Sequence, residues 1–406
     1  MTNLKGKTVV LGVSGGISVY KVVELLRLLS KSGADVHVVM TAAAMEFVTP
    51  LTFQTLSGNP VSTELFSLYQ EREIGHISLA DRADLVVIAP ATANIIGKIA
   101  NGIADDLLTT TVMASKAPLL VAPAMNVNMY ENPAYMENEN KLRRRGGCFV
   151  PPEEGALACG ISAKGRLAAV ETIFEAITDI LSPKDLAGET VMVTAGPTRE
   201  ELDPVRYISN HSSGLMGYEL ARGARQRGAR VILVSGPSCL KPPSGVELVQ
   251  VTTALQMRDV VMERVSECTV VIKAAAVADY RPVKRQDDKI KKKGEHLLLE
   301  LEKNPDILAE LGALENHPLL VGFAAETTEL LANAAAKMAA KNLDLIVAND
   351  VTREGAGFNV PTNIATILYR DGRTESVEKM GKGELAWLIL DRTVEIRGMG
   401  ASGNPL

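Results

Sequence analysis

The sequence is poor in cysteine and in aromatic residues. Its 406 residues include four cysteines, which are scattered and form no CxxC pair. This usage argues against a disulfide framework or a cysteine-rich zinc cluster, and it fits a reducing compartment. Aromatic residues make up 4% of the chain. Aliphatic side chains on strands and helices must therefore fill most of the core.

Long apolar runs and an excess of positive charge are also missing. No uncharged apolar stretch reaches the roughly 18 residues of a transmembrane helix, and the N-terminus enters a strand pattern without the shape of a signal peptide. The formal net charge is -5, whereas general nucleic-acid binding uses a basic surface. We expect a cytoplasmic protein that acts on small molecules and has no nucleic-acid or membrane partner.

The overall composition is typical of a globular protein with a large core. Hydrophobic residues make up 46% of the chain and charged residues 22%. A chain of this length is expected to form two or three domains.

Apolar strand patterns alternate with helical stretches, and this alternation starts twice. Strands are expected at 8–13, 35–41, 84–90, 117–123, 190–196, 229–237, 269–280, 318–327 and 343–350, and helices at 18–32, 214–226, 327–341 and 383–397. Such buried strands between helices indicate parallel sheets covered on both faces. We predict an α/β protein of two doubly wound, Rossmann-like domains with mainly parallel sheets, residues 1–184 and 185–406, and a frayed Gly-rich tail.

The first strand is followed by "GVSGGIS", a hydroxyl and two glycines that lead into a helix. Backbone N–H groups at such a helix start can hold a phosphate. The loop lacks the GxGxxG fingerprint of dinucleotide-binding domains, and a plain tight turn between strand and helix explains it equally well.

Three further features of the first half bear on a ligand site. "APATAN" and "PAMN" follow strand ends, where ligands of open α/β sheets bind. His76 precedes a strand, although a lone histidine is more often structural. Cys159 lies in a loop rich in glycine and alanine. A lone cysteine is usually a small buried residue, but in an accessible polar loop it is a candidate for chemistry.

Taken in order, "SGGIS", "GHISLADRADLVVIAPATAN", "PAMN" and "ACG" followed by "GR" resemble the homo-oligomeric flavin-containing cysteine decarboxylases, specifically the phosphopantothenoylcysteine decarboxylases. The resemblance implies bound FMN, with the phosphate near the first loop and the ring near "PATAN". The implied cofactor residues are Ser14, Gly15, Gly16, Ile17, Thr41, Pro90, Ala91, Thr92, Ala93 and Asn94.

The chemistry of this family accounts for the residue types. A cysteine carboxylate loses CO₂ only if an electron sink is available, and flavin supplies one by oxidising the CH₂–SH group to a thioaldehyde. The resemblance implies that His76 is the base, that Asn126 holds the substrate carboxylate and that Cys159 donates the final proton. One departure from the family pattern is Ala163, where a glycine is usual.

The second half opens with "TAGPTREELDPVRYISNHSSG", which has no Walker-A lysine and is therefore no P-loop. Its arginines, hydroxyls, Asn210 and following helix start form a plausible wall for an anion and an acyl group. A long surface loop capped by Ser212 is the alternative. A basic run such as that from Lys289 to Lys293 is, judged by its composition alone, usually a solvent-exposed face of the protein.

The ordered segments "TAGPTRE", "LDPVRYISNHSSG", "AAVADY", "KIKK", "KNPDI" and "GFAAET" resemble the phosphopantothenate–cysteine ligases. This implies that CTP and Mg²⁺ activate the carboxylate of 4′-phosphopantothenate as an acyl-cytidylate, which the amine of cysteine then attacks. Asn210 would orient the acyl-cytidylate, Lys289 would offset phosphate charge, and Asp279 would meet the metal. The implied CTP residues are Lys273, Ala274, Ala275, Asp279, Lys289, Asn304, Pro305, Asp306, Ile307, Phe323, Lys337 and Lys341.

The two halves in this order resemble the bacterial bifunctional enzymes of coenzyme A biosynthesis. That resemblance implies decarboxylase trimers assembled into a dodecamer, and ligase dimers. Leu215 departs from the family pattern, which commonly has lysine there. Two alternatives remain: a flavin-binding regulatory scaffold, and a nicotinamide oxidoreductase, for which neither half has the required fingerprint.

Overall fold

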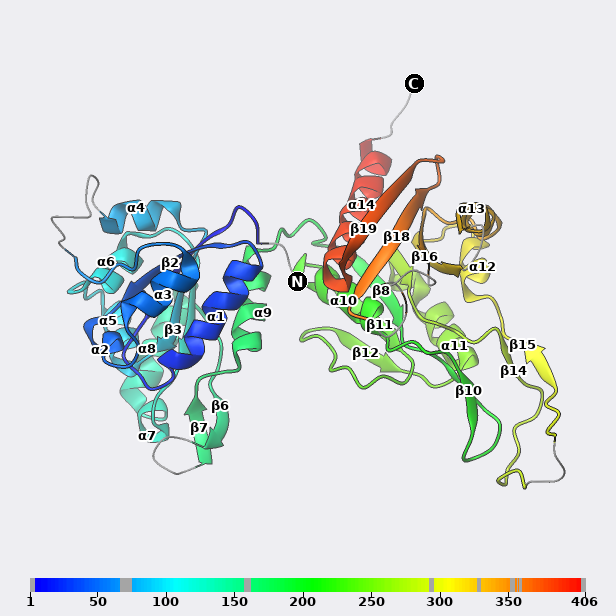
Figure 1. Ribbon diagram of the computed structural model, residues 1–406, viewed down its shortest axis with the longest axis horizontal. Coiled ribbons are helices and arrows are strands. Elements are labelled where there is room, and N and C mark those ends of the chain that lie inside the picture. The colour runs from blue at the N-terminus through cyan, green and yellow to red at the C-terminus, as the bar shows by residue number, and fades with distance from the viewer. Residues whose placement is uncertain are drawn as a thin grey trace. The chain divides into compact units, whose positions relative to one another are not determined.

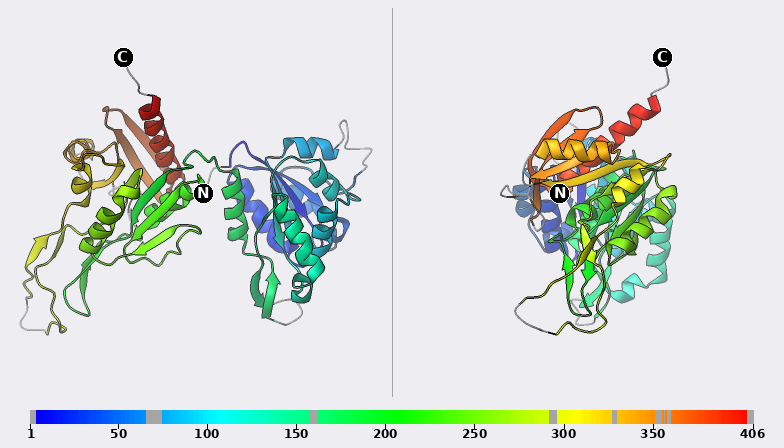
Figure 2. Two further views of the ribbon diagram at one scale, coloured as in Figure 1. Left: turned by 180° about the vertical axis from the view of Figure 1, so that it is seen from behind. Right: turned by 90° about the vertical axis from the view of Figure 1, so that its right-hand side faces the viewer.

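The computed structural model describes residues 4–65, 75–156, 162–291, 296–326, 330–350, 355, 357 and 360–402. The chain divides into two compact units, one that ends at Ser182 and one that begins at Pro183. Each unit contains a sheet with helices on both of its faces (Figures 1 and 2).

The first unit is built on a five-stranded parallel sheet in the order β2-β1-β3-β4-β5. Its strands are β1 (Thr8–Val13), β2 (Asp35–Met40), β3 (Leu85–Ala91), β4 (Leu119–Pro123), β5 (Cys148–Phe149), and a separate hairpin of β6 (Glu153–Ala156) and β7 (Ser162–Arg166). Its helices are α1 (Val19–Lys31), α2 (Ala42–Met45), α3 (Pro50–Ser57), α4 (Gly75–Arg82), α5 (Ala93–Asn101), α6 (Leu107–Ala114), α7 (Val127–Tyr130), α8 (Pro133–Arg144) and α9 (Val170–Leu181).

Successive side chains of these strands point to opposite faces, so the apolar runs form two cores. Leu11 and Val87 pack with α1, α3 and α9 in one core, whereas Val10 and Ile88 pack with α4, α5, α6 and α8 in the other. This explains why the strands read as continuous apolar runs. Loops after β1, β3 and β4 consequently meet at the carboxyl edge of the sheet.

The second unit is built on an eight-stranded sheet in the order β12-β11-β8-β13-β16-β17-β18-β19. Its strands are β8 (Thr190–Ala195), β11 (Arg230–Ser235), β12 (Glu247–Gln250), β13 (Val270–Lys273), β16 (Leu319–Glu326), β17 (Leu345–Asp350), β18 (Thr362–Tyr369) and β19 (Thr374–Gly381). Its helices are α10 (Leu215–Gln226), α11 (Ala254–Arg264), η1 (Val265–Glu267), α12 (Ile307–Gly312), α13 (Leu330–Ala340) and α14 (Lys382–Ser402).

The strands of this sheet are parallel from β12 to β17, whereas the pairings of β17 with β18 and of β18 with β19 at one edge are antiparallel. Residues of α10 and α14 pack on one face, and residues of α11, α12 and α13 pack on the other. The predicted α/β class with mainly parallel, doubly wound sheets is therefore confirmed in both units.

Two antiparallel hairpins extend from the second unit: β9 (Arg199–Glu201) with β10 (Tyr207–Ser209), and β14 (Tyr280–Pro282) with β15 (Leu301–Lys303). The β14–β15 hairpin reaches away from the sheet, as both views show (Figures 1 and 2). We refer to the described residues 280–291 and 296–303 as the arm. The apolar run 269–280 predicts a single strand, but β13 ends at Lys273 and Tyr280 begins β14. The four hairpin strands have three residues each, which is too short for a recognisable strand pattern.

A buried arginine holds the beginning of the second unit to its last helix. Arg227 donates to Asp185 at 2.8 and 2.6 Å and to Asp391 of α14 at 2.6 Å. Its guanidinium also lies 5.5 Å from the ring centroid of Trp387. Two carboxylates and an aromatic face compensate the desolvation of this cation.

The expected tail differs from the structure. Residues 398–402 continue α14 instead of fraying, while residues 403–406 lie outside the described part of the chain. Across the described ranges, no helix combines the length and apolar character needed to cross a bilayer.

Candidate functional site

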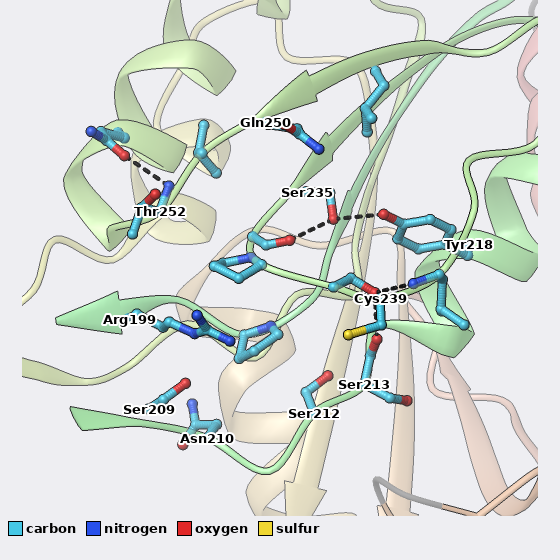
Figure 3. Close-up of a pocket in the computed structure, with 18 of the residues that line it drawn as sticks. Arg199, Ser209, Asn210, Ser212, Ser213, Tyr218, Ser235, Cys239, Gln250 and Thr252 are labelled. Carbon is cyan, nitrogen blue, oxygen red and sulfur yellow. Dashed lines mark hydrogen bonds between the residues drawn. The ribbon is translucent and has the colours of Figure 1, made fainter. Parts of the chain in front are cut away.

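A large cavity of the second unit lies at the carboxyl edge of its sheet. It has a volume of about 1270 Å³ and opens where the chain leaves β8, β11 and β12. Asn210, Ser212 and Ser213 line it on the segment that leads into α10 (Figure 3). The hydroxyls, the amide and the N-terminus of a 12-residue helix suit a phosphate-bearing ligand.

Asn210 connects this cavity to the end of β13. Its Nδ2 donates to the carbonyl of Ala276 at 3.0 Å. The chain after β13 is itself held by β8 and its loop, because Ala275 N–H donates to Thr194 Oγ1 and Ala278 N–H donates to Thr198 Oγ1. These contacts fix the side chain of Asn210 between the cavity and the β13 loop.

A charged cluster occupies the neighbouring part of the carboxyl edge. Lys341 forms an ion pair with Asp306 at 2.8 Å. Burial and the charge of Lys341 lower the pKa of Lys273 to about 8, although the charges of Asp306 and Asp279 oppose this shift. Although burial pushes the pKa of Asp306 upward, its bond with Lys341 and its other contacts hold the pKa below the ordinary value.

The structure thus brings together part of the predicted CTP set. Lys273, Asp279, Asp306, Lys337 and Lys341 interact electrostatically, although they come from β13, its loop, the start of α12 and α13. Asn304 joins the same region, since its N–H donates to the carbonyl of Asp279 and its Nδ2 to that of Ala278.

The remaining predicted residues of this unit differ in position. Ala274 and Ala275 use their N–H groups within the fold, Ile307 is buried in α12, and Phe323 is half-buried in β16. Lys289 lies on the arm and lines another cavity of about 550 Å³. Within the described ranges, no group of three metal-binding side chains is close enough to hold an ion by itself.

The first unit also has a cavity at the carboxyl edge of its sheet, of about 560 Å³. Six of the predicted residues line it: Gly15, Gly16, Ile17, Thr92, Ala93 and Asn126. They come from the loops after β1, β3 and β4, which the parallel topology brings to one edge.

The loop after β1 requires glycine where it approaches α2. A Cβ atom on Gly15 would lie 2.4 Å from the Cβ of Ala43 and 2.8 Å from its carbonyl carbon. At Gly16 the nearest atoms to such a Cβ would be 3.9 Å away, so a side chain there would fill the cavity instead. The two glycines therefore have different functions, close packing and open space.

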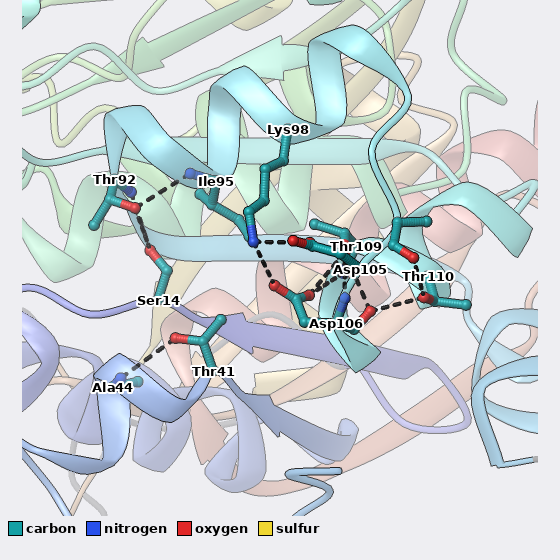
Figure 4. Close-up of polar contacts among 11 residues, drawn as sticks. Ser14, Thr41, Ala44, Thr92, Ile95, Lys98, Asp105, Asp106, Thr109 and Thr110 are labelled. Carbon is teal, nitrogen blue, oxygen red and sulfur yellow. Dashed lines mark hydrogen bonds and ion pairs between the residues drawn. The ribbon is translucent and has the colours of Figure 1, made fainter. Parts of the chain in front are cut away.

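Ser14 lies beneath this loop. Its Oγ donates to the carbonyl of Pro90 at 2.7 Å and accepts from the N–H of Thr92 at 3.0 Å. It also lies 3.3 Å from the hydroxyl of Thr92 (Figure 4). Its own N–H donates to the same carbonyl. Ser14 is buried and joins the β1 and β3 loops.

Other predicted residues of this unit lie away from the lining. The Thr41 hydroxyl caps α2 by accepting from the N–H of Ala44 (Figure 4). Pro90 and Ala91 belong to the buried strand β3, and Asn94 is exposed on α5. His76 is on α4, and its Nδ1 is a buried atom without a hydrogen-bond partner within the described chain. Cys159 lies outside the described residues, between β6 and β7.

Strand β7 packs closely against the loop that bears Asn126. Met125 N–H donates to the carbonyl of Gly165 at 3.0 Å, and a Cβ on Gly165 would lie 2.3 Å from the carbonyl oxygen of Met125. Ala163 pairs with Gly155 of β6. The Asn126 side chain caps α7 by accepting from Asn128 at 2.9 Å.

Sequence reasoning missed two cavity residues on the first turn of α1, Tyr20 and Lys21. Burial and the nearby charge of Arg166 lower the pKa of Lys21 below its ordinary value. Two cations on one small cavity indicate an anionic ligand. Tyr20 and Lys21 lie four and five residues after Gly16, and this spacing is the sequence signal, because one turn of helix returns them to the side of that loop.

Comparisons with known proteins cover both units. Residues 1–182 match the family model described as Flavoprotein, and residues 186–396 match the DNA/pantothenate metabolism flavoprotein C-terminal domain. The coenzyme A biosynthesis bifunctional protein CoaBC of Bacillus subtilis (strain 168) is 49% identical over 95% of this chain and 96% of its own length. That of Escherichia coli (strain K12) is 47% identical over 97% of this chain and 98% of its own.

A solved structure of the C-terminal domain of a coenzyme A biosynthesis bifunctional protein CoaBC is 41% identical to this chain. It covers 53% of this chain and 98% of its own, with a TM-score of 0.46. The two family models together with the nearly full-length relatives establish that this chain belongs to the family of coenzyme A biosynthesis bifunctional proteins.

Proposed function

We propose that residues 185–406 join 4′-phosphopantothenate to cysteine with CTP, and that residues 1–184 decarboxylate the product to 4′-phosphopantetheine with FMN. As a member of its family, the chain is a bifunctional enzyme of coenzyme A biosynthesis with a decarboxylase and a ligase activity. The observation that supports the assignment most strongly is that Gly15, Gly16 and Asn126 share one cavity.

The residues of this cavity fit FMN. Gly15 lets the loop pack against Ala43, Gly16 leaves the start of α1 open for a phosphate, and Lys21 and Arg166 supply positive charge. Ile17 and Tyr20 also line the cavity, and both are 61% exposed. Exposed apolar side chains at a cavity rim suit a planar ring, whose binding would remove them from water.

When bound, FMN would accept two electrons from the carbon that bears the substrate thiol and later return them. Asn126 would hold the substrate carboxylate with its amide, and His76 would remove a proton. Cys159 would donate the final proton. Ser14 would position the β1 loop through its bonds to the β3 loop instead of touching the phosphate.

Replacing Gly15 with valine should yield a protein without bound FMN. The valine would collide with the backbone of Ala43, which cannot move aside as a flexible side chain can. We expect the purified variant to lack flavin absorbance, while its rate of pyrophosphate release from CTP stays unchanged. The same variant carrying flavin in full amount would contradict the close-packing function of Gly15.

In the ligase unit, CTP would bind beside the charged cluster at the ends of β13 and β16. Lys273, Lys337 and Lys341 would offset the triphosphate charge, and Mg²⁺ would bind mainly phosphate oxygens together with Asp279. The acyl-cytidylate would form beside Asn210, where the 1270 Å³ cavity provides room for the acyl group. Lys289 would stabilise the charge that develops as pyrophosphate leaves.

The pH dependence of the ligase tests the function of Lys273. Its pKa of about 8 means that the ammonium is present below this pH and is lost above it. Because only the charged form attracts phosphates, kcat/KM for CTP should fall as the pH rises through about 8. Lys273→Arg, which stays charged, should remove this fall from the pyrophosphate-release profile. An unchanged profile in this variant would assign the titration to another group.

We further propose that the decarboxylase forms trimers assembled into a dodecamer, and the ligase dimers. His76 lies off the cavity of its own chain, so a neighbouring copy would complete the site. The arm exposes Leu297, Leu298 and Leu299, which a second ligase unit would cover. The mass of the assembly in solution tests this; a single-chain mass would contradict it.

The flavin content and activity of purified protein test the assignment as a whole. Yellow protein that releases CO₂ from phosphopantothenoylcysteine is the expected result. Yellow protein that releases none would favour the flavin-binding regulatory scaffold, and colourless protein would contradict both.

A further inference from the structure

A buried carboxylate connects the β9–β10 hairpin to the arm. The side chain of Asp203 is 0% exposed. Its Oδ1 accepts from the N–H groups of Val205 and Arg206, each at 2.8 Å. Its Oδ2 accepts from Arg206 Nε at 2.9 Å and Nη2 at 2.6 Å, and from the N–H of Ile290 at 3.0 Å. Oδ1 therefore stabilises the turn of the β9–β10 hairpin, and Oδ2 binds the backbone of the arm.

Both polar groups of the Ile290 backbone, its N–H and its C=O, are bonded to the β9–β10 hairpin. Arg206 Nη2 also donates to the carbonyl of Ile290 at 2.7 Å, so Asp203 and Arg206 together hold the N–H and the C=O of one residue. A third bond runs from the N–H of Gln286 to the carbonyl of Leu202 at 2.9 Å.

The chemistry of this contact makes it specific. An ionised carboxylate is costly to bury unless donors surround it. Although burial pushes the pKa of Asp203 upward, the Arg206 side chain and the N–H groups of Ile290, Val205 and Arg206 hold it far below its ordinary value. Asp203 is thus charged at neutral pH, and its bonds to cationic and backbone donors are of the stronger kind.

Besides these bonds, an ion pair between Arg285 and Glu201 joins the arm to β9 four residues before Lys289. Asp287, Asp288 and Lys289 are all exposed, and β14 ends at Pro282. Ile290 directly follows Lys289, so the bonds to Ile290 fix the backbone from which the Lys289 side chain extends.

We propose that Asp203 is a positioning residue of the ligase, which fixes Lys289 by binding the peptide of Ile290. The inference rests on the proposed function of Lys289 in the activation step. Without this contact, the backbone beside Lys289 would adopt many conformations, and its ammonium would meet the departing pyrophosphate less often.

Asp203→Asn separates the two functions of this carboxylate. The amide keeps one oxygen, which can still accept from Val205 and Arg206 and so retain the turn. Its NH₂ group replaces Oδ2 and cannot accept from Ile290 or Arg206. Asp287→Asn is the matched control, because it makes the same chemical change on an exposed arm residue.

The experiment measures pyrophosphate release from CTP and 4′-phosphopantothenate by Asp203→Asn, Lys289→Gln and the double variant of the full chain. Asp203→Asn should lower kcat roughly 10- to 100-fold, and Asp287→Asn should not. The double variant should be no slower than Lys289→Gln, because residues that act through one another are not additive. Amide exchange of residues 283–291 should accelerate, while decarboxylation and exchange in β8 and β11 stay unchanged.

Three results would overturn the inference. A normal rate for Asp203→Asn, with Lys289→Gln slow, would show that Lys289 needs no such support. Multiplied losses in the double variant would show that Asp203 acts independently of Lys289. A normal rate of pyrophosphate release by Lys289→Gln would contradict the proposed function of Lys289 itself. Should Asp203→Asn unfold the unit, Arg206→Lys, which weakens the contact with Ile290 from its other side, provides the same comparison.

Discussion

Replacing Asn210 with aspartate should stop amide synthesis while decarboxylation continues unchanged. Asn210 donates a hydrogen bond to the carbonyl of Ala276, which an ionised carboxylate cannot do. The new charge would also face the phosphates of CTP and of the acyl-cytidylate. Losing one preorganised donor and adding repulsion should lower kcat of the ligase on the order of 1000-fold.

The measurement follows amide formation and CO₂ release separately in the same preparation. Asn316→Asp, an exposed change in the loop between α12 and β16, is the matched control and should leave both rates unchanged. An equal fall of both activities in Asn210→Asp would indicate misfolding. Normal amide formation by Asn210→Asp would show that Asn210 has no part in the ligase reaction.

Replacing Cys159 with serine should abolish the formation of 4′-phosphopantetheine while FMN stays bound. A serine hydroxyl is a far weaker acid than a thiol and so transfers its proton poorly to the decarboxylated product. The described residues that line the cavity assigned to FMN, among them Gly15, Gly16 and Asn126, are unchanged in this variant, so flavin absorbance should remain.

Product analysis with phosphopantothenoylcysteine as substrate checks this outcome. Cys148→Ser changes an exposed cysteine of the same unit and should have normal turnover. Pyrophosphate release from CTP should be normal in both variants. A normal yield of 4′-phosphopantetheine from Cys159→Ser would show that another group donates the proton.

Much of the fold is predictable from local sequence because its strands are buried on both faces. The run 8–13 is β1 without a change of boundary, and the helix expected at 18–32 is α1, Val19–Lys31. Each run is long, apolar and bounded by glycine or a cap, so local and tertiary preferences agree. The extra strands β18 and β19 were not predicted, since their alternating pattern faces solvent on one side.

The candidate sites are less predictable, because contacts between distant loops determine them. "GVSGGIS" indicates a phosphate loop, yet nothing in it shows that Ser14 bonds Pro90, 76 residues away. Likewise, Asp203 and Ile290 are separated by 87 residues and meet only because the arm returns to the β9–β10 hairpin.

The most direct test of the whole account is one assay of the purified chain with 4′-phosphopantothenate, cysteine and CTP, in which pyrophosphate and CO₂ are followed separately. We predict that both products appear, that omitting CTP or cysteine prevents CO₂ release, and that added phosphopantothenoylcysteine restores CO₂ release without any pyrophosphate. Absence of CO₂ from phosphopantothenoylcysteine, or its formation from 4′-phosphopantothenate and cysteine without CTP, would contradict the account.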